Sequence, residues 1–407
     1  MSSLSVLHLS TYDAHGGAAR AAVAIHQALL DQNIDSQMRV AYKSTSDPSI
    51  TQGRDLPFKF SKELDRRLWS VQRSETDTWR SAAKFGVLSA REINRSLADI
   101  VHLHWVTDGY LSVESIGKIR KPIVWSLCDA WAFSGTEHYA MGQSEIRSAQ
   151  GYTKANRIQS DSGFDLDKWT WERKRKNWRT PMYLLPASSW LKTAVRRSAL
   201  MGTWPTVQIP HVVDTNEFAP LSGRVTNEKP TLLFLTSSGI HDRRKGWDLL
   251  VEALRSVPSS QPIRILVVGP KPTATEQTEI QENTEHEYVF HGEARGNAEL
   301  VALYQQADIT VVPSREDNMP ITAMESQSCG TPVVSFAIGG LPDIVLPGIT
   351  GYLASPGDAE DLAHGIQMVL ASNLRADTRQ HATRMWSPEV VVPQLLDVYQ
   401  QALTRGN

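Results

Sequence analysis

Two acidic side chains eight positions apart lie around the start of one predicted helix. Asp317 and Glu325 belong to residues 313–340, which read PSREDNMPITAMESQSCGTPVVSFAIGG. Pro320 suits a first helical turn because its missing N–H is not needed there, and Asn318 is a good cap residue just before it. We therefore expect Asp317 in the loop before the helix and Glu325 about one and a half turns inside it.

The start of this predicted helix is a candidate phosphate site. Free backbone N–H groups at a helix N-terminus bind phosphate readily, and Asn318, Met319 and Pro320 are expected to line that end. A phosphate with a carboxylate on each side suits a nucleotide diphosphate sugar, because ribose and hexose hydroxyls can donate to Asp317 and Glu325. An ordinary β-loop-α-β unit with exposed acids is the alternative for this segment taken alone.

A cationic run precedes a second predicted helix. Arg243, Arg244 and Lys245 stand directly before Gly246 and Trp247, and the pattern predicts that they open the helix. Positive charge at a helix N-terminus opposes the helix dipole, so stability alone does not favour it. A bound anion compensates for this cost, which makes the run a second candidate for binding phosphate. A solvated surface cluster is the alternative.

A pair of glycines follows the first apolar run of the chain. Gly16 and Gly17 lie between residues 6–9, a predicted strand, and a predicted helix. Glycines let a ligand approach the backbone closely, and the helix start adds its dipole. The loop lacks the G-x-G-x-x-G pattern of dinucleotide folds, which argues against a nicotinamide enzyme. A purely structural turn is the alternative.

Two histidines share one face of a predicted strand. His102 and His104 alternate within residues 100–104, so their side chains point the same way, as residues that line a site do. A histidine in a strand is more often structural, so His104 is a candidate on position alone.

Short apolar runs and helical periodicity alternate in two series along the chain. Buried parallel strands have such runs, so the sequence predicts an α/β protein with two doubly wound sheets joined by the polar stretch 221–230. The predicted strands are 6–9, 100–104 and 123–127 in the first series, and 232–235, 263–268, 288–291 and 309–312 in the second. Predicted helices begin after Gly17, near Trp190, at Trp247 and at Pro388.

The composition of the 407 residues is that of a soluble protein with two cores, because 41% of the residues are hydrophobic. A formal net charge of −2 gives no case for a nucleic-acid partner, and no apolar stretch reaches the roughly 20 residues that span a bilayer. Cys128 and Cys329 lie far apart, so neither a disulfide framework nor a cysteine metal site is implied. The N-terminus lacks a signal-peptide pattern, so we expect a cytoplasmic protein. We expect no cofactor either.

The segment with the two acids resembles the nucleotide-binding signature of retaining glycosyltransferases of family 4. In that signature the second acid is followed by a small-Cys-Gly-x-Pro-Val-Val strand and a Gly-Gly turn, which match residues 328–334 and 339–340. The resemblance implies the GT-B fold, two Rossmann-like domains facing across a cleft. It implies an acceptor-side domain at 1–212, a nucleotide-sugar-binding domain at 213–385, and a last helix at 386–407 that packs back on the first domain.

The same resemblance implies a reaction and roles. A sugar is transferred from a nucleotide diphosphate sugar to an acceptor with the α-configuration kept. Lys245 and Arg244 neutralise the departing diphosphate, and Arg243 is the lesser candidate. Glu325 holds the ribose and Asp317 the transferred hexose, although most family members have Glu at the first acid position. No metal is implied, because a D-x-D motif is missing from any site position and the cations can do its electrostatic work.

Residues 125–135, which read WSLCDAWAFSG, resemble a branch of this family that builds exopolysaccharides and O-antigens. Cys128 stands where that branch has a histidine near the donor hexose, so we expect His104 or Asp129 to supply the missing polar contact. The Gly16 and Gly17 loop matches the family loop that meets the diphosphate.

A basic and aromatic run, residues 168–179 with sequence KWTWERKRKNWR, is a candidate membrane contact. A helix of this composition can lie on an anionic bilayer, and it would bring the protein to a polyprenyl-diphosphate-linked acceptor at the inner face of the membrane. A solvated helix with its tryptophans packed inward is the alternative.

These features favour a retaining glycosyltransferase that transfers a sugar to a glycan or lipid-linked saccharide in cell-surface polysaccharide biosynthesis. A non-catalytic GT-B protein that binds a nucleotide sugar or glycan is the alternative; Cys128 favours it, whereas Lys245 and Glu325 argue against it. A sucrose-phosphate-type synthase would need a further anion pocket in the first domain, and the sequence does not identify one.

Overall fold

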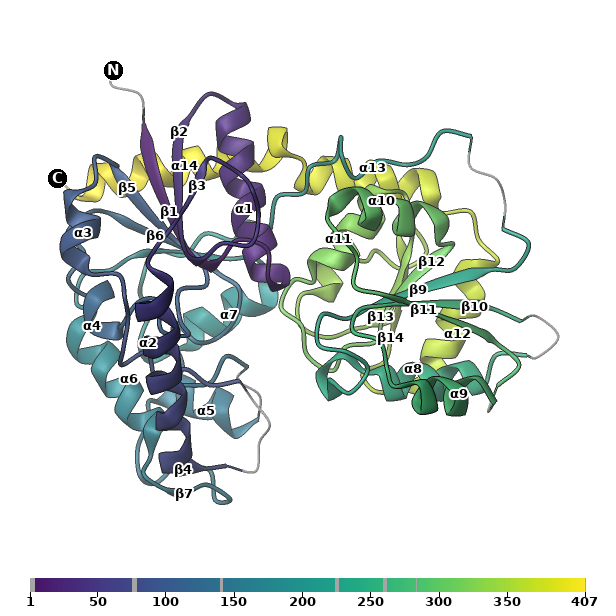
Figure 1. Cartoon of the computed structure of the whole chain (residues 1–407), viewed down its shortest axis with the longest axis horizontal. Coiled ribbons are helices and arrows are strands. Elements are labelled where there is room, and N and C mark those ends of the chain that lie inside the picture. Colours follow the sequence, from purple (N-terminus) through teal and green to yellow (C-terminus); the bar gives the residue numbers. More distant parts are fainter. Residues whose placement is uncertain are drawn as a thin grey trace. The chain divides into compact units, whose positions relative to one another are not determined.

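A computed structural model describes residues 4–74, 79–139, 142–223, 227–258, 262–282 and 284–406. The chain divides into two compact units. The first comprises Met1–Pro210 with Val392–Asn407, and the second comprises His211–Val391. Each unit contains a six-stranded parallel sheet with helices around it (Figure 1). The middle of the polar stretch 221–230, residues 224–226, lies outside the described residues.

The sheet of the first unit has the strand order β3-β2-β1-β5-β6-β8, with every pair parallel. The predicted strands 6–9, 100–104 and 123–127 are confirmed. The polar residues Ser10 and Thr11 extend the first of them. The strands are β1 (Ser5–Tyr12), β2 (Asp35–Tyr42), β3 (Ile50–Gln52), β5 (Ile100–Leu103), β6 (Ile123–Leu127) and β8 (Tyr183–Pro186).

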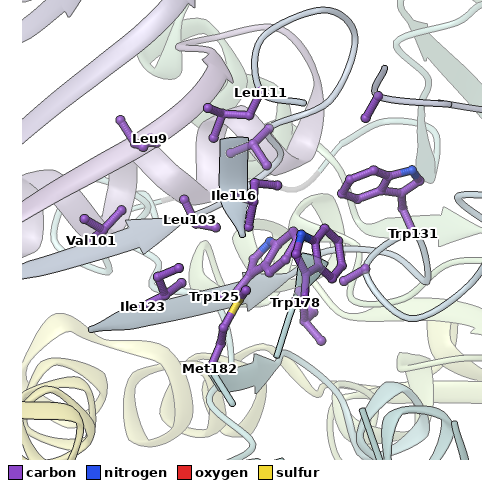
Figure 2. Packing of buried hydrophobic residues seen from close by; sticks show 14 of the residues in the cluster. Leu9, Val101, Leu103, Leu111, Ile116, Ile123, Trp125, Trp131, Trp178 and Met182 are labelled. Carbon is purple, nitrogen blue, oxygen red and sulfur yellow. The ribbon is translucent and has the colours of Figure 1, made fainter. Parts of the chain in front are cut away.

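Helices cover this sheet, and tryptophans fill much of the space between the layers. Trp125 of β6 packs against Trp131 and Trp178, beside Leu103 and Ile116 (Figure 2). The helices are α1 (Gly16–Asp31), α2 (Asp55–Arg67), α3 (Ala90–Arg95), α4 (Val113–Ile116), α5 (Gln143–Gln150), α6 (Leu166–Asn177) and α7 (Ser189–Arg197), and α2 continues into the 3₁₀ turn η1 (Leu68–Val71). A two-stranded antiparallel pair, β4 (Gln72–Arg73) with β7 (Ser162–Gly163), lies beyond η1.

The last helix, α14 (Pro388–Gly406), contributes its residues from Val392 onward to the first unit. The Tyr399 hydroxyl lies 2.7 Å from Nδ1 of His102, and the Tyr183 hydroxyl donates to the Gln401 carbonyl at 3.1 Å. Leu395, Val398, Tyr399 and Ala402 are buried as the helical spacing predicts. This end of the chain is therefore part of the first core.

The sheet of the second unit has the order β11-β10-β9-β12-β13-β14, again all parallel. The predicted strands of the second series are confirmed within one residue at each end. The strands are β9 (Thr231–Leu235), β10 (Arg264–Val268), β11 (Glu287–Gly292), β12 (Ile309–Val312), β13 (Val333–Phe336) and β14 (Gly351–Ala354). The helices are α8 (Trp247–Arg255), α9 (Ala274–Glu282), α10 (Asn297–Gln306), α11 (Ile321–Ser328), α12 (Ala359–Leu370) and α13 (Arg375–Trp386), with 3₁₀ turns η2 (Arg243–Lys245) and η3 (Leu341–Asp343).

Strand order reverses beside the first strand of each sheet. In the second unit β9 lies between β10 and β12, so the chain turns to opposite sides on leaving these strands. In doubly wound sheets this switch point opens a crevice at the carboxyl ends of the strands, and ligands bind there. The crevice between β9 and β12 is thus the place to look for a site.

The prediction that residues 168–179 form a membrane-facing basic surface is wrong at its centre. The Lys174 side chain is buried, its Nζ donates to the Gly135 carbonyl at 2.8 Å, and it lies 3.9 Å from the centre of the Trp131 ring. Arg173 is buried too and pairs with Glu114 at 2.6 Å. Backbone carbonyls, an acid and aromatic rings compensate these charges inside the first unit. Within the described ranges, no helix has both the length and the hydropathy needed to cross a bilayer.

Candidate functional site

A small pocket lies at the switch point of the second sheet. Its lining comes from the ends of β9 and β12, from Lys245 and from the first turn of α11, and comprises Phe234, Leu235, Lys245, Thr310, Val311, Val312, Pro313, Ser314 and Thr322. The hydroxyl of Ser314 is buried and has no hydrogen-bond partner among the described residues. A buried hydroxyl without a partner is costly, so this one is suited to a ligand or a water molecule.

Opposite charges meet beside this pocket. Nζ of Lys245 lies 2.7 Å from Oδ2 of Asp317, and Nη1 of Arg244 lies 3.6 Å from the same oxygen. Burial alone raises the pKa of the Asp317 carboxyl, but the charges of Lys245 and Arg244 outweigh it and hold that pKa below its ordinary value. Asp317 is therefore a carboxylate at neutral pH, held between two cations.

A tight turn directs Lys245 toward Asp317. The turn η2 is capped by Asp242, whose side chain accepts from the Arg244 backbone N–H at 3.0 Å. Gly246 follows with φ +70°, and a Cβ there would lie 1.9 Å from the Pro313 carbonyl oxygen. Only glycine fits this approach to the end of β12. The predicted start of the helix at Trp247 is confirmed. The three cations stand before it in η2 and do not form its first turn, because the left-handed Gly246 separates η2 from α8.

The two remaining cations of this segment differ in exposure. Arg244 is half-buried and its Nη1 also donates to the Glu316 carbonyl at 3.3 Å, so its guanidinium stays on the acidic loop. The Arg243 side chain is exposed, and its carbonyl accepts from Arg315 at 2.8 Å. The structure thus brings Arg244 and Lys245 to Asp317, and Arg243 faces solvent.

The glycine turn after β13 supports the acidic loop. Gly339 has φ +52°, and a Cβ there would lie 1.8 Å from the Asp317 carbonyl oxygen. The Gly340 N–H donates to the same oxygen at 3.2 Å. These contacts explain why a Gly-Gly turn accompanies the acid in one sequence signature: the turn touches the backbone that carries the carboxylate.

The start of α11 differs from the prediction. Pro320 is the cap residue itself, with extended backbone at ψ 113°, and the first helical residue is Ile321. Asn318 therefore lies two positions before the cap, and its side chain is buried. The predicted end is confirmed: Gly330 has φ +74° just after the last turn.

Glu325 lies inside a helix that is buried on nearly every side. The Tyr304 hydroxyl of α10 donates to Glu325 Oε2 at 3.0 Å, and the carboxylate is almost fully covered. Asp317 instead contacts the cations of η2. The two acids predicted to flank one phosphate thus have different partners, one cationic and one a neutral hydroxyl.

His211 is a further residue near Asp317 that sequence reasoning missed. It lies at the start of the second unit and is buried; burial lowers its pKa to about 4, against the opposing effect of the Asp317 charge. The imidazole is therefore neutral at physiological pH. It adds a polar but uncharged group beside the acid.

The first unit has its own small pocket, at the carboxyl ends of β5 and β6. Its polar lining includes His104, Cys128, Asp129 and His138, with Trp105 and Trp131 among the aromatic walls. Nδ1 of His138 lies 2.5 Å from Oδ2 of Asp129, and the Trp105 indole N–H donates to the same oxygen at 3.0 Å. Sequence reasoning named Asp129 and missed His138, nine residues further on.

His104 belongs to a buried histidine cluster as well as to this pocket. Its Nε2 lies 2.9 Å from Nδ1 of His8, and His102 contacts the Ser126 hydroxyl at 2.8 Å as well as Tyr399. Burial lowers the pKa of His8 and of His102, so both are neutral. The three histidines could offer nitrogens to a metal ion, since these lie within 4.8 Å of one another. Both nitrogens of His102 are already hydrogen-bonded, which favours a hydrogen-bond network.

Cys128 is a neutral thiol. Burial, together with the negative charge of Asp129, raises its pKa to about 12. A protonated thiol is a weak hydrogen-bond donor and a poor nucleophile at neutral pH. The stronger hydrogen-bonding groups of this pocket are therefore Asp129, His138 and His104.

The loop after β1 is open in front of its first glycine. Helix α1 begins at Gly16, which has φ +81°, and a Cβ there would meet no atom within 4 Å. Gly17 follows within the first turn. The backbone at the start of α1 is thus accessible to a ligand, as the sequence predicts for this loop.

The signals for the missed residues differ. Tyr304 lies on α10, which the sequence analysis did not predict, and Ser314 lies two residues beyond the predicted strand β12. Their contacts with Glu325 and with the pocket depend on packing between α10, β12 and α11. His138 lies three residues after the segment 125–135, which resembles exopolysaccharide and O-antigen enzymes. The spacing of nine residues between Asp129 and His138 matches neither a helical nor a strand repeat, so the sequence gives no sign that the two side chains meet.

Comparison with known proteins assigns the second unit to a class. Residues 222–385, most of the second unit, match the family model "Glycosyl transferases group 1". Together the two Rossmann-like parallel sheets give the chain the GT-B fold.

Individual relatives fall into two kinds. A D-inositol 3-phosphate glycosyltransferase of Corynebacterium aurimucosum is 30% identical over 210 residues, covering 47% of this chain and 50% of that protein, and one of Xylanimonas cellulosilytica is 32% identical, covering 44% of each. The chain thus spans about half the length of the curated relatives it matches.

Among solved structures, a sucrose-phosphate synthase from Thermosynechococcus elongatus superposes with a TM-score of 0.65 at 18% identity, covering 98% of this chain and 100% of that one. Anabaena HepE in complex with UDP and glucose gives 0.64 at 15% identity with the same coverage. These structures share the fold.

Proposed function

We propose that the protein is a retaining, metal-independent glycosyltransferase. It moves a sugar from a nucleotide diphosphate sugar to a glycan or lipid-linked saccharide acceptor in cell-surface polysaccharide biosynthesis. The observation that carries the proposal is the cluster of Lys245, Arg244 and Asp317 at the switch-point pocket of a group 1 glycosyltransferase module.

The cations take up the charge of the leaving diphosphate. Breaking the sugar–phosphate bond moves negative charge onto the diphosphate, and preorganised positive groups lower the barrier because they need no reorganisation at that moment. Lys245 and Arg244 are preorganised in this sense, since Asp242 and Gly246 fix the turn that carries them. Their two charges serve in place of a divalent ion.

Asp317 exchanges partners when the donor binds. With Lys245 attracted to the diphosphate, the carboxylate becomes available to accept from a hydroxyl of the transferred hexose. Its lowered pKa keeps it ionised for this role, and an acceptor-only group suits a sugar hydroxyl, which donates. Ser314 at the pocket wall supplies a further contact to phosphate or sugar.

Glu325 holds the ribose, and Tyr304 positions it. The hydroxyl of Tyr304 donates to one carboxylate oxygen and so orients the carboxylate, whose oxygens are the acceptor type that nucleoside hydroxyls need. The buried environment strengthens such hydrogen bonds.

The first unit has candidate contacts of its own. Gly16 and Gly17 present accessible backbone to phosphate, and Asp129 with His138 provides an acceptor and a proton-carrying group in a pocket with tryptophan walls. Aromatic faces beside a carboxylate suit a saccharide, which has apolar C–H faces and donating hydroxyls. We assign this pocket to the sugar being transferred or accepted.

The class of acceptor is supported by the segment 125–135, which resembles exopolysaccharide and O-antigen enzymes. The curated relatives are named for a different acceptor, an inositol phosphate, but they align with only about half of their length. Acceptor panels should therefore include lipid-linked saccharides and inositol phosphates together.

Two measurements test the proposal. A thermal-shift panel of nucleotide diphosphates should show one that stabilises the protein, by about 2.7 kcal/mol at 100 times its dissociation constant. The sugar-linked form of that nucleotide should then be hydrolysed slowly without acceptor. Tight binding with neither hydrolysis nor transfer across a broad donor and acceptor set would establish the non-catalytic alternative instead.

A further inference from the structure

The outward face of α2 carries large apolar side chains that the described fold leaves uncovered. The helix buries Phe58, Ser61 and Asp65 on its inner side. On the opposite side Leu56 is 81% exposed and Phe60 is 68% exposed. They are four positions apart in the sequence, so they lie one helical turn apart and form a single patch. Grouped exposed apolar side chains mark an interaction surface.

Cations flank this patch. Lys59 and Arg66 are exposed and seven residues apart, which places them on one flank of the line through Leu56 and Phe60. Glu63 lies on the outward side too, but Arg67 pairs with it at 3.1 Å and offsets its charge. Asp55 is exposed one turn before Lys59 on the same flank. The exposed cations Lys59, Arg66 and Arg67 therefore exceed the two acids Asp55 and Glu63 by one charge, and the face combines apolar groups with a small net positive charge.

More exposed apolar groups lie immediately beyond the helix, where α2 leads through η1 toward β4 and β7 (Figure 1). The side chains of Val71, Trp79 and Phe164 are exposed. The Phe164 N–H donates to the Val71 carbonyl at 2.9 Å, and the Trp79 ring lies 5.4 Å from that of Trp69 on η1. Aromatic rings of this kind are typical of the boundary between lipid and water.

The inner side of α2 is tied to the carboxyl edge of the first sheet. Nζ of Lys62 lies 2.7 Å from the Tyr12 hydroxyl and 2.7 Å from Asp108, and the Phe58 ring contacts the Tyr12 ring edge-on. Tyr12 is the last residue of β1, four positions before Gly16. A surface bound by α2 is thereby coupled to that loop within the same unit.

We propose that α2 docks the first unit on an anionic lipid bilayer. Leu56 and Phe60 enter the boundary between headgroups and acyl chains, and Lys59 and Arg66 contact lipid phosphates. An apolar face with flanking cations complements such a surface in both polarity and charge, as interfacial helices do. The inference rests on the proposed function in one respect: a lipid-linked acceptor would be located in the bilayer on which α2 docks. It moves the membrane contact from α6, whose central cations are buried, to α2.

Co-sedimentation of the full chain with lipid vesicles tests the docking. The parent should bind vesicles of phosphatidylcholine mixed with phosphatidylglycerol and bind pure phosphatidylcholine weakly. The variant L56S/F60S should lower partitioning about 10-fold or more, since it removes the inserted apolar groups. The variant K59E/R66E should lower it about 25-fold or more on the mixed vesicles, at about 5-fold for each cation lost, because the two new acids also repel the anionic lipid.

Matched controls exist in the same unit. Leu97→Ser removes a leucine that is 93% exposed outside the α2 face, and K176E/R179E reverses two exposed cations at the end of the α6 run. Both should keep parental partitioning. Loss of binding with K176E/R179E and not with K59E/R66E would overturn the proposal, as would a parent that binds neither kind of vesicle.

Two further readouts separate the docking from its rivals. A parent that self-associates without vesicles, with L56S/F60S abolishing the association, would show that the face binds a second copy and overturn the bilayer. Donor hydrolysis without vesicles should be unchanged in both α2 variants. Hydrolysis by a parent that ignores vesicles overturns only the docking, whereas vesicle binding by a parent without any transfer or hydrolysis overturns only the proposed function.

Discussion

Lys245 and Asp317 are 72 residues apart in the chain, and their charged groups meet at 2.7 Å beside the switch-point pocket of the second sheet. Neither side chain is in a regular helix or strand. Each is held by a glycine that no other residue could replace without a clash: Gly246 for the lysine and Gly339 for the acid. The backbone thus holds the lysine and the aspartate together before any ligand binds. This ion pair is the most direct target for experiment.

Replacing Lys245 by alanine should reduce turnover by about 100-fold or more, because one preorganised group that stabilises the leaving diphosphate is lost. Initial rates of transfer or donor hydrolysis at saturating donor measure this. Arg243→Ala is the matched control, since that cation is exposed in the same turn, and it should stay within a few-fold of the parent. Arg244→Ala should fall between the two. Near-parental activity of Lys245→Ala would remove the lysine from the reaction.

The ion pair of Asp317 should make stability depend on pH with a definite sign. Its folded pKa is below the ordinary value of 3.8, so the stabilisation is fully present above about pH 4 and is lost as pH falls through the lowered value. Urea unfolding should show Asp317→Asn less stable than the parent by about 1.5–3 kcal/mol between pH 5 and 8. The difference should shrink at lower pH. A difference that grows on acidification contradicts the assignment.

Removal of the Glu325 carboxylate should weaken nucleotide diphosphate binding by about 1.5–3 kcal/mol while the fold persists. Tyr304→Phe tests the positioning role separately: it keeps the carboxylate but removes the hydroxyl that holds it, so affinity should drop by about 0.5–1.5 kcal/mol. Calorimetric titration of the nucleotide measures both variants. Unchanged affinity in Glu325→Ala would take this residue out of the ribose role.

Gly339→Ala should damage the site through the backbone of Asp317. The new methyl group would lie 1.8 Å from the Asp317 carbonyl oxygen, so the acidic loop must move. Gly348→Ala is the control, because Gly348 also has a positive φ, +75°, but a Cβ there meets no atom within 4 Å. Both variants carry the backbone strain of about 1–2 kcal/mol, and only Gly339→Ala should lose donor binding. Equal binding by the two variants would show that the turn does not position the acid.

Cys128→Ala should be nearly silent in turnover. The thiol is neutral because burial and the Asp129 charge raise its pKa to about 12, so it neither ionises nor donates strongly at neutral pH. Slow alkylation of Cys128 at pH 7 is the companion measurement. Asp129→Asn, which removes the charge beside His138, should by contrast lower turnover clearly. A large loss in Cys128→Ala would show that the smaller residue has a direct role.

The sequence by itself determined the elements and the candidate chemistry. Buried parallel strands are continuous apolar runs, and helices repeat every three to four residues, so local spacing located β5, β6, β9 and β12 and the two acids around α11. Glycine and proline marked where the chain turns. Each of these patterns involves residues that are close in the chain, so it can be recognised in one sequence.

Only the tertiary structure decided which charged groups meet. Lys174 looked like a surface cation and is buried against carbonyls and Trp131, whereas Lys245 meets Asp317 and His138 meets Asp129. The cap position of α11 is Pro320 and not the predicted Asn318, and the asparagine side chain is buried in the loop before it. Such outcomes depend on the cost of burying charge without a partner and on contacts between segments far apart in the chain, and neither leaves a periodic trace in the sequence.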